Sequence, residues 1–332
     1  MCLKTPDFWY SDSAAAKLIA GAISPASFFY KAGYRLHQKS AKPYASRLPV
    51  ICVGNLTAGG SGKTPVALAV MDIVKTNFPA ANPCFLTRGY GRKSADCHIV
   101  SDRDNARTSG DEALLLARCA PTVVSADRKA GALLAEQADF GLIVMDDGLQ
   151  NPGLEKTLKL VVIDGASGFG NGHLLPAGPL RVPLMEGLAG ADAFILIGED
   201  RHGIEKKLPS GKPLLRARLE VPSSWTADRT APYIAFCGLG RPEKFKTTIE
   251  AQGLTLAGWH AFPDHYRFTV ADLQQLDREA SEKNARLLTT EKDAARLPAE
   301  FSWNNPPVIM PVEIIWEFPA QIEQLLASSV KK

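Results

Sequence analysis

The chain has 332 residues, which suggests two domains of ordinary size. Its 45% hydrophobic and 22% charged residues are typical of a globular protein and exclude a disordered chain, a collagen and a disulfide mini-protein. The six cysteines form no C-x-x-C pair, so neither a disulfide framework nor a thiolate metal site is expected, and a reducing compartment fits. The first 50 residues hold seven basic and two acidic residues and carry +5, whereas the remainder, with 31 and 33, carries −2.

The basic excess lies in two short helices that the sequence predicts at residues 8–24 and 27–39, on either side of Pro25. The second helix has an apolar stripe of Phe28, Phe29, Ala32 and Leu36 and a basic stripe of Lys31, Arg35 and Lys39. Such a helix either lies in the interface of an anionic membrane or packs on its domain with a solvated edge, and both remain open. The early Asp7 and Asp12 argue against a signal peptide, and no run reaches the ~18–20 apolar residues of a spanning helix, so we expect a cytoplasmic protein.

From residue 48 onward, short apolar runs alternate with helical stretches. Strands are expected at 48–53, 83–87, 121–124, 141–145, 158–164 and 193–198, and helices at 65–75, 111–119, 128–138 and 185–190. This alternation predicts an α/β fold with a parallel sheet covered by helices on both faces. After a cluster of Pro and Ser at 222–232, a second unit has expected strands at 233–237, 286–290 and 308–312 and helices at 242–252 and 292–297. The predicted divisions are a helical segment at 1–45, a sheet domain at 46–225 and a smaller α/β domain at 226–332.

The glycine-rich segment after the first strand is the strongest functional signal. Residues 53–65 (VGNLTAGGSGKTP) follow a strand and open a helix, where backbone N–H groups and the helix dipole bind phosphate oxygens. Lys63 is expected to reach the β- and γ-phosphates of a nucleotide, and the Thr64 hydroxyl to bind Mg²⁺. The pattern G-x-x-x-x-G-K-[ST] has glycine where this chain has Thr57. The residues expected around the nucleotide are Thr57, Ala58, Gly59, Gly60, Ser61, Gly62, Lys63 and Thr64.

Two aspartates at the end of a later strand support a nucleotide site. Strand 141–145 runs into Asp146 and Asp147, and a carboxylate beside a phosphate loop holds Mg²⁺ directly or through water. Both residues are therefore candidate metal ligands, although such a pair is also common at a plain turn.

Two further segments carry candidate catalytic groups. Ser109 and Glu112 fit a capping box on helix 111–119, while the catalytic alternative has Asp111 or Glu112 facing the γ-phosphate, and the two roles can coexist. His265 follows an aspartate in a turn-like segment of the second unit, and it can act with the phosphate loop only if the two domains close over the substrate.

The basic loop 87–93 (TRGYGRK) also follows a strand. Its Arg88 and Arg92 either grip an anionic substrate or belong to a solvated turn. The net charge of +3 is too low, and the basic segments are too scattered, for a nucleic-acid-binding protein.

Together, these segments resemble one family closely. The motifs are VGNLTAGGSGKTP (53–65), TRGYGRK (87–93), SGDEA (109–113), MDDGLQ (145–150), LLPAGPLR (174–181), FPDHY (262–266) and TTEKDAARL (289–297). In this order they are similar to those of the tetraacyldisaccharide 4′-kinases, P-loop kinases of the lipid A pathway in Gram-negative bacteria. The resemblance implies a Mg²⁺-dependent transfer of the ATP γ-phosphate to the 4′-hydroxyl of a tetraacylated glucosamine disaccharide 1-phosphate, which gives lipid IVA.

The resemblance also implies partners and residue roles. The partners are the acylated disaccharide lipid and the anionic cytoplasmic face of the inner membrane, with no nucleic acid and no protein partner. The family's catalytic aspartate and histidine correspond to Asp111 and His265, with Glu112 beside them and Lys63 on the phosphates. We expect Asp111, oriented by His265, to accept the proton of the acceptor hydroxyl. The residues expected near the substrate are Arg88, Tyr90, Arg92 and Arg181.

The chain departs from the family pattern at two positions. The usual D-D-G-F-Q-H ends here in Asn151, and the usual L-R-E-P has Val182 in place of its glutamate. The family places that histidine and glutamate in the cleft, so their joint loss implies a retuned site with the phosphate loop and the Asp–His pair intact.

Two other functions fit parts of the sequence. A membrane-associated P-loop ATPase switch of the partitioning type would carry a lysine early in its loop, where this chain has Thr57 and Ala58. A P-loop kinase of a soluble metabolite would not need the basic, aromatic N-terminus.

Overall fold

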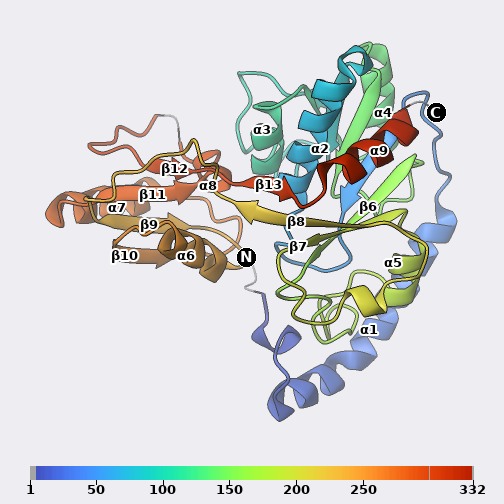
Figure 1. Ribbon diagram of the computed structural model, residues 1–332, viewed down its shortest axis with the longest axis horizontal. Coiled ribbons are helices and arrows are strands. Elements are labelled where there is room, and N and C mark those ends of the chain that lie inside the picture. The colour runs from blue at the N-terminus through green and yellow to red at the C-terminus, as the bar shows by residue number, and fades with distance from the viewer. Residues whose placement is uncertain (1–4, 299, 331–332) are drawn as a thin grey trace.

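The computed structural model describes residues 5–298 and 300–330 and contains two sheets that lie side by side (Figure 1). The larger sheet has nine strands in the order β13-β8-β7-β6-β1-β5-β2-β4-β3, and the smaller has four in the order β10-β9-β11-β12. Neighbouring strands are parallel except in the pairs β13–β8 and β3–β4. The predicted α/β fold with helices on both faces of a parallel sheet is confirmed.

Helices cover both faces of the larger sheet because its central strands are buried on both sides. In β1, Ile51 and Val53 point into one core, and Val50 and Cys52 into the other. The strands are β1 (Val50–Gly54), β2 (Pro83–Thr87), β3 (His98–Ile99), β4 (Thr122–Val124), β5 (Leu142–Asp146), β6 (Leu158–Asp164), β7 (Ala193–Ile197), β8 (Leu214–Glu220) and β13 (Glu313–Trp316). One face carries α2 (Lys63–Asn77), α3 (Asp111–Ala117) and α9 (Pro319–Val330), and the other α4 (Arg128–Gln137) and α5 (Leu184–Ala189).

The smaller sheet repeats this arrangement with one helix on each face. Phe245 of α6 (Pro242–Ala251) packs on one side, and Leu273 of α7 (Val270–Glu282) on the other. Its strands are β9 (Tyr233–Cys237), β10 (Leu256–Ala261), β11 (Arg286–Thr290) and β12 (Val308–Met310), and the short helix α8 (Glu291–Ala294) follows β11 directly. The described part of the chain also contains the 3₁₀ turns η1 (Asp7–Trp9), η2 (Pro79–Ala81) and η3 (Glu205–Lys207).

The smaller domain ends earlier than the predicted range 226–332. After β12 the chain returns to the larger sheet, where β13 pairs antiparallel with β8 and α9 packs Ile322 and Leu326 into the core beside α2. The segment 313–330 therefore belongs to the larger domain. The strand and helix patterns of the sequence do not reveal this return, because the pairing of β13 with β8 is a long-range contact.

The predicted break at Pro25 is wrong, since a single helix α1 (Ala14–Ser40) runs through it. Ser13 caps its first turn by accepting a hydrogen bond from the Ala16 N–H. A proline inside a helix leaves the carbonyl four residues earlier without its donor, but here the Ser24 hydroxyl donates to the Gly21 carbonyl at 2.9 Å. This local replacement lets the helix continue. Within the described ranges, no helix combines the length and apolar character needed to cross a bilayer.

Candidate active site

The predicted phosphate loop joins β1 to α2. Gly59 and Gly62 have φ of 103° and 84°, a left-handed backbone that favours glycine. Beneath the loop, Asn55 Nδ2 donates to the Thr57 carbonyl and to Ser61 Oγ, each at 2.7 Å, and so holds the turn together. Thr57 forms an antiparallel bridge with Leu180. Its strand-like pairing explains why this position does not require the glycine of the usual motif.

The two aspartates that follow β5 have different partners. Asp146 is almost fully buried and its Oδ2 accepts a hydrogen bond from Thr64 Oγ1 at 3.1 Å. Asp147, with φ of 54°, turns instead to Arg181, whose NH1 lies 3.0 Å from both carboxylate oxygens, and to Lys63 Nζ at 3.7 Å. Burial opposes the ionisation of Asp147, but Lys63 and Arg181 hold its pKa below the usual value.

Asp146 has the surroundings of a carboxylate that binds a cation. Burial and the carboxylates of Glu112 and Asp147 raise the pKa of Asp146 to about 7. Its Oδ1 is buried and receives no hydrogen bond from the described residues. These residues contain no group of three or more His, Cys, Asp or Glu side chains that could hold a metal alone. Mg²⁺ beside a nucleotide usually takes one or two carboxylates and fills its shell with phosphate oxygens and water, so the donor set around Asp146 fits Mg²⁺.

The second half of the site lies where the two domains meet. Asp111 begins α3, and its Oδ2 lies 3.0 Å from His265 Nδ1 and 2.6 Å from Arg296 Nε, both in the smaller domain. Burial alone would raise the pKa of Asp111, but His265 and Arg296 hold it well below its usual range. The predicted Asp111–His265 pair is thus brought together across 154 residues of chain.

Hydrogen-bond partners assign the tautomer of His265. Because the Asp111 carboxylate is ionised and can only accept, Nδ1 carries the proton. Nε2 then accepts from Lys292 Nζ at 3.2 Å, and the same ammonium donates to Glu112 Oε1 at 3.1 Å. The Tyr90 ring lies 4.9 Å from the His265 ring, centroid to centroid. The His265 imidazole is therefore anchored beside Asp111 through both of its ring nitrogens.

The capping-box interpretation of Ser109 and Glu112 is wrong. The N-cap of α3 is Gly110, which has φ of 89° and no side chain to cap with. The Ser109 hydroxyl points away and lies 2.8 Å from His98 Nε2, while Glu112 contacts Lys292. The left-handed turn at Gly110 explains both orientations, and it frees Glu112 for the junction between the domains.

The residues expected near the substrate do not all face the junction. Tyr90 contacts His265 and Arg181 binds Asp147, so both lie beside the two halves of the site. Arg92 donates to the Asp96 carbonyl of its own loop at 2.6 Å, and Arg88 is exposed to solvent.

Sequence patterns assigned no role to two residues of this site, Lys292 and Arg296. They lie four residues apart just after the carboxyl end of β11, so they face the same way from one short helical segment. The signal that could have found Lys292 and Arg296 is a basic i, i+4 pair at the carboxyl end of a parallel strand.

The sequence patterns also do not predict a second contact between the domains. In this contact, Arg241 and Lys244 each lie 2.6 Å from Asp164 Oδ2.

The two departures from the family pattern have local structural roles. Asn151 Oδ1 accepts a hydrogen bond from the Gly153 N–H at 2.9 Å, and Val182 is buried in an apolar cluster with Leu56 and Leu188. Neither side chain contacts Asp111 or His265 through a hydrogen bond or ion pair within the described ranges.

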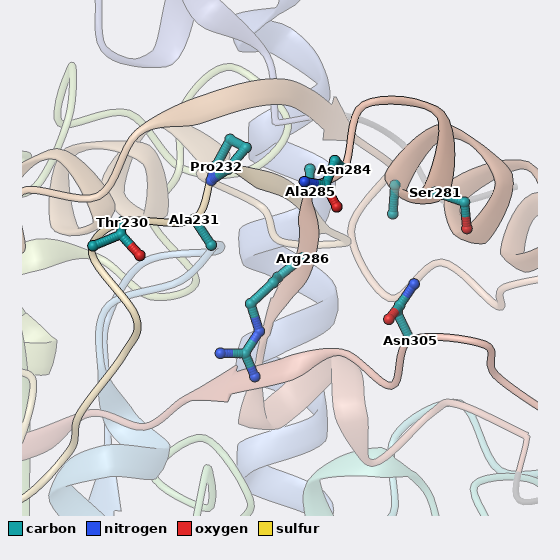
Figure 2. A pocket seen from close by; sticks show the side chains of 9 residues that line it. Thr230, Ala231, Pro232, Ser281, Asn284, Ala285, Arg286 and Asn305 are labelled. Carbon is teal, nitrogen blue, oxygen red and sulfur yellow. The ribbon is translucent and has the colours of Figure 1, made fainter.

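A cavity of about 530 Å³ lies outside the candidate active site (Figure 2). It is formed at the amino ends of β9 and β11 and the end of α7, where Arg286 lies between Thr230 and Asn305. This is the opposite edge of the smaller sheet from Arg296. None of the predicted site residues lines it.

An enzyme that carries a phosphate loop in one domain and completes an Asp–His pair with a second domain belongs among the two-domain P-loop phosphotransferases. The comparisons with known proteins narrow this class. A family model described as Tetraacyldisaccharide-1-P 4′-kinase matches residues 19–331, and the chain belongs to this family. The resemblance inferred from the motifs is confirmed.

Individual relatives match over nearly their whole length. Tetraacyldisaccharide 4′-kinase of Rhodospirillum centenum is 42% identical, covering 98% of this chain and 96% of the relative, and that of Paramagnetospirillum magneticum is 44% identical, covering 97% and 98%. A crystal structure described as an "apo" form of LpxK from Aquifex aeolicus in complex with ATP is 27% identical, with a TM-score of 0.74 over 94% of this chain and 99% of that chain.

Proposed function

We propose that this protein transfers the γ-phosphate of ATP to the 4′-hydroxyl of a tetraacylated disaccharide 1-phosphate and so forms lipid IVA. The observation that carries the proposal is the Asp111–His265 pair, which lies at the junction of the domains and shares the carboxyl edge of the larger sheet with the phosphate loop. A kinase needs a group that orients the hydroxyl of its alcohol substrate toward the γ-phosphate and receives its proton, and the Asp111 carboxylate can serve both needs.

In this mechanism the larger domain holds the nucleotide. The amides of residues 57–64 and the Lys63 ammonium bind the β- and γ-phosphates. Thr64 and Asp146 would hold Mg²⁺, and the ion would neutralise charge on the phosphates. Asp146 fits this role better than Asp147, because Asp147 is already bound by Arg181. Arg181 could contact the substrate only by breaking its ion pair with Asp147.

Asp111 receives the proton of the 4′-hydroxyl as the phosphoryl group is transferred. A carboxylate with a low pKa is a weak base, but the loose transition state of phosphoryl transfer needs the hydroxyl to be oriented more than deprotonated in advance. His265 donates from Nδ1 to Asp111 and keeps it in place. Glu112 holds Lys292 beside the imidazole.

The lipid would approach along α1, at the cytoplasmic face of the inner membrane. One side of α1 packs on the larger domain, where Tyr30 OH donates to the Arg181 carbonyl at 3.0 Å. The opposite side exposes apolar side chains flanked by a basic stripe of Lys17, Lys31, Arg35 and Lys39. The exposed apolar side chains are Leu18, Phe28, Phe29 and Leu36, with 69–75% of their surfaces free. Aromatic rings below cations suit the interface of an anionic bilayer. The Tyr30 contact, on the packed side of the same helix, places α1 beside Arg181.

Transfer of ³²P from γ-labelled ATP to a tetraacyl disaccharide 1-phosphate in mixed micelles tests the activity. We expect labelled lipid with the wild type and none above background with Lys63→Ala, with the new phosphate at the 4′ position by NMR. ATP hydrolysis by the wild type without labelled lipid would contradict the proposal and favour the ATPase switch.

Flotation with vesicles containing anionic lipid tests the membrane face. The double variant Phe28→Ser/Phe29→Ser should bind roughly 10³-fold more weakly, because each buried ring contributes on the order of 2 kcal/mol and about 1.4 kcal/mol corresponds to tenfold. Val270→Ser, which removes an exposed apolar side chain from the smaller domain, is the matched control and should float like the wild type. Equal flotation of all three proteins would exclude α1 as the membrane-binding face.

A further inference from the structure

Arg296 links the two domains at the carboxylate of Asp111. The distance from its Nε to Asp111 Oδ2 is 2.6 Å, and only 3% of the Arg296 side chain and 7% of the Asp111 side chain are exposed. The two residues are 185 positions apart in the sequence. A buried pair of this kind is costly to break, since either partner would be left as an uncompensated buried charge.

The segment that presents Arg296 is rigid. Thr290 ends β11 and caps α8, and its hydroxyl donates to Asp293 Oδ2 at 2.7 Å. Asp293 is fully buried, and its Oδ1 accepts from Arg296 NH1 at 2.9 Å. The same NH1 donates to the Gly238 carbonyl at the end of β9, also at 2.9 Å. Two neighbouring strand ends therefore fix the plane of the guanidinium before it reaches Asp111.

The two oxygens of Asp111 are not equivalent. Arg296 Nε and His265 Nδ1 both donate to Oδ2. Among residues 5–298 and 300–330, no group donates to Oδ1, and this atom is not sealed from solvent. A carboxylate with both protein donors on one oxygen presents the other, with its free lone pairs, to an incoming hydroxyl.

We propose that Arg296 is a positioning residue, which by occupying Oδ2 of Asp111 turns Oδ1 toward the acceptor hydroxyl. The inference rests on the proposed role of Asp111 as the proton acceptor. Lys292 complements it from the same segment, because it occupies Nε2 of His265 and leaves only Nδ1 to donate to Oδ2. The NH2 group of Arg296 is buried and finds no partner among the described residues, a cost that a purely structural link would not need.

Steady-state kinetics of Arg296→Ala and Arg296→Lys test the proposal. Loss of the guanidinium lets the carboxylate rotate, so Arg296→Ala should lower kcat by ~100-fold while the KM for ATP stays within about twofold. Lysine restores the charge but cannot bridge Asp111 and Asp293 as a planar fork, so Arg296→Lys should recover part of kcat, to about 10-fold below the wild type.

Asp277→Asn is the matched control. Asp277 is likewise a buried carboxylate of the smaller domain, but it accepts from the backbone N–H groups of Asn304 and Asn305 rather than from residues of the site. This variant should lower Tm while keeping kcat within about 3-fold of the wild type. If Arg296→Ala keeps kcat within about 3-fold, or if Asp277→Asn loses kcat as severely, the positioning role is excluded.

Asp111→Asn, measured in the same assay, separates the two levels of the proposal. If Asp111→Asn is inactive and Arg296→Ala is fully active, the positioning inference alone fails. If Asp111→Asn turns over like the wild type, the proton-acceptor role of Asp111 fails and the inference fails with it.

Discussion

The site has a nucleotide half, formed by the phosphate loop and the aspartates after β5, and an acceptor half, formed by Asp111 with His265 and Arg296. Each half contains a buried aspartate, and the charges around the two aspartates are opposite in sign. Asp146, in the nucleotide half, lies among the carboxylates of Glu112 and Asp147, and its pKa is raised to about 7. Asp111, in the acceptor half, meets Arg296 and His265, and its pKa is held well below the usual range. Both carboxyl groups are buried, so the neighbouring charges decide whether the pKa is raised or lowered.

The difference reflects how each half is assembled. The nucleotide half is local, because the phosphate loop and Asp146 come from adjacent parallel strands of one sheet. The negative charge around Asp146 is not fully neutralised by the protein, which suits the binding of a metal ion together with a nucleotide. The acceptor half needs both domains, since His265 and Arg296 reach Asp111 from the smaller sheet. Its charge is balanced by the protein itself.

Of the substitutions that test this comparison, the replacement of Asp111 by asparagine should lower turnover the most. Asp111→Asn removes the proposed proton acceptor, so kcat should fall by ~10³-fold, within the usual range for a general base. The affinity for ATP, measured by calorimetric titration, should stay within about twofold because the phosphate loop is untouched. A loss of ATP affinity equal to the loss of turnover would show that the two halves are not separate.

Replacement of His265 should have a smaller effect. His265→Ala removes one of two donors to Asp111 Oδ2 and leaves Arg296, so kcat should fall by ~10²-fold. His260→Ala is the control, because His260 also binds a carboxylate, Glu279 at 2.8 Å, but lies outside the site. Turnover of His265→Ala at the level of His260→Ala would remove His265 from the mechanism.

The raised pKa of Asp146 predicts a modest effect on stability when metal is absent. The carboxyl binds its proton more tightly in the folded chain than in the unfolded one, so it stabilises the fold at low pH, and this contribution is lost as the pH rises through about 7. Asp146→Asn removes the charge, so in EDTA it should gain Tm relative to the wild type between pH 5 and pH 8, by on the order of a few degrees. Parallel Tm curves for the two proteins would contradict a raised pKa.

The local half of the site could be predicted from sequence, and the reason is physical. The loop at 53–65 and the aspartates after β5 are adjacent in sequence to the elements that position them. By contrast, the Asp111–His265 pair was placed by family resemblance, and Arg296 was not assigned any role. No periodicity encodes a contact across 185 residues.

Two of the wrong predictions have local causes that simple sequence rules omit, and the third has a long-range cause. Pro25 does not end its helix because the Ser24 hydroxyl serves the carbonyl that the proline leaves without a donor. Ser109 does not cap α3 because Gly110 takes a left-handed turn between them. The return of β13 to the larger sheet depends on its pairing with β8, which no local pattern reveals.

The kcat of the double variant Asp111→Asn/His265→Ala tests most directly whether the acceptor half acts as one unit across the domain junction. If His265 acts only through Asp111, the double variant should be about as slow as Asp111→Asn alone, since residues that act as a unit are not additive. If the two single losses instead multiply, to ~10⁵-fold, the two residues act independently, and the account of a pair assembled from both domains is contradicted.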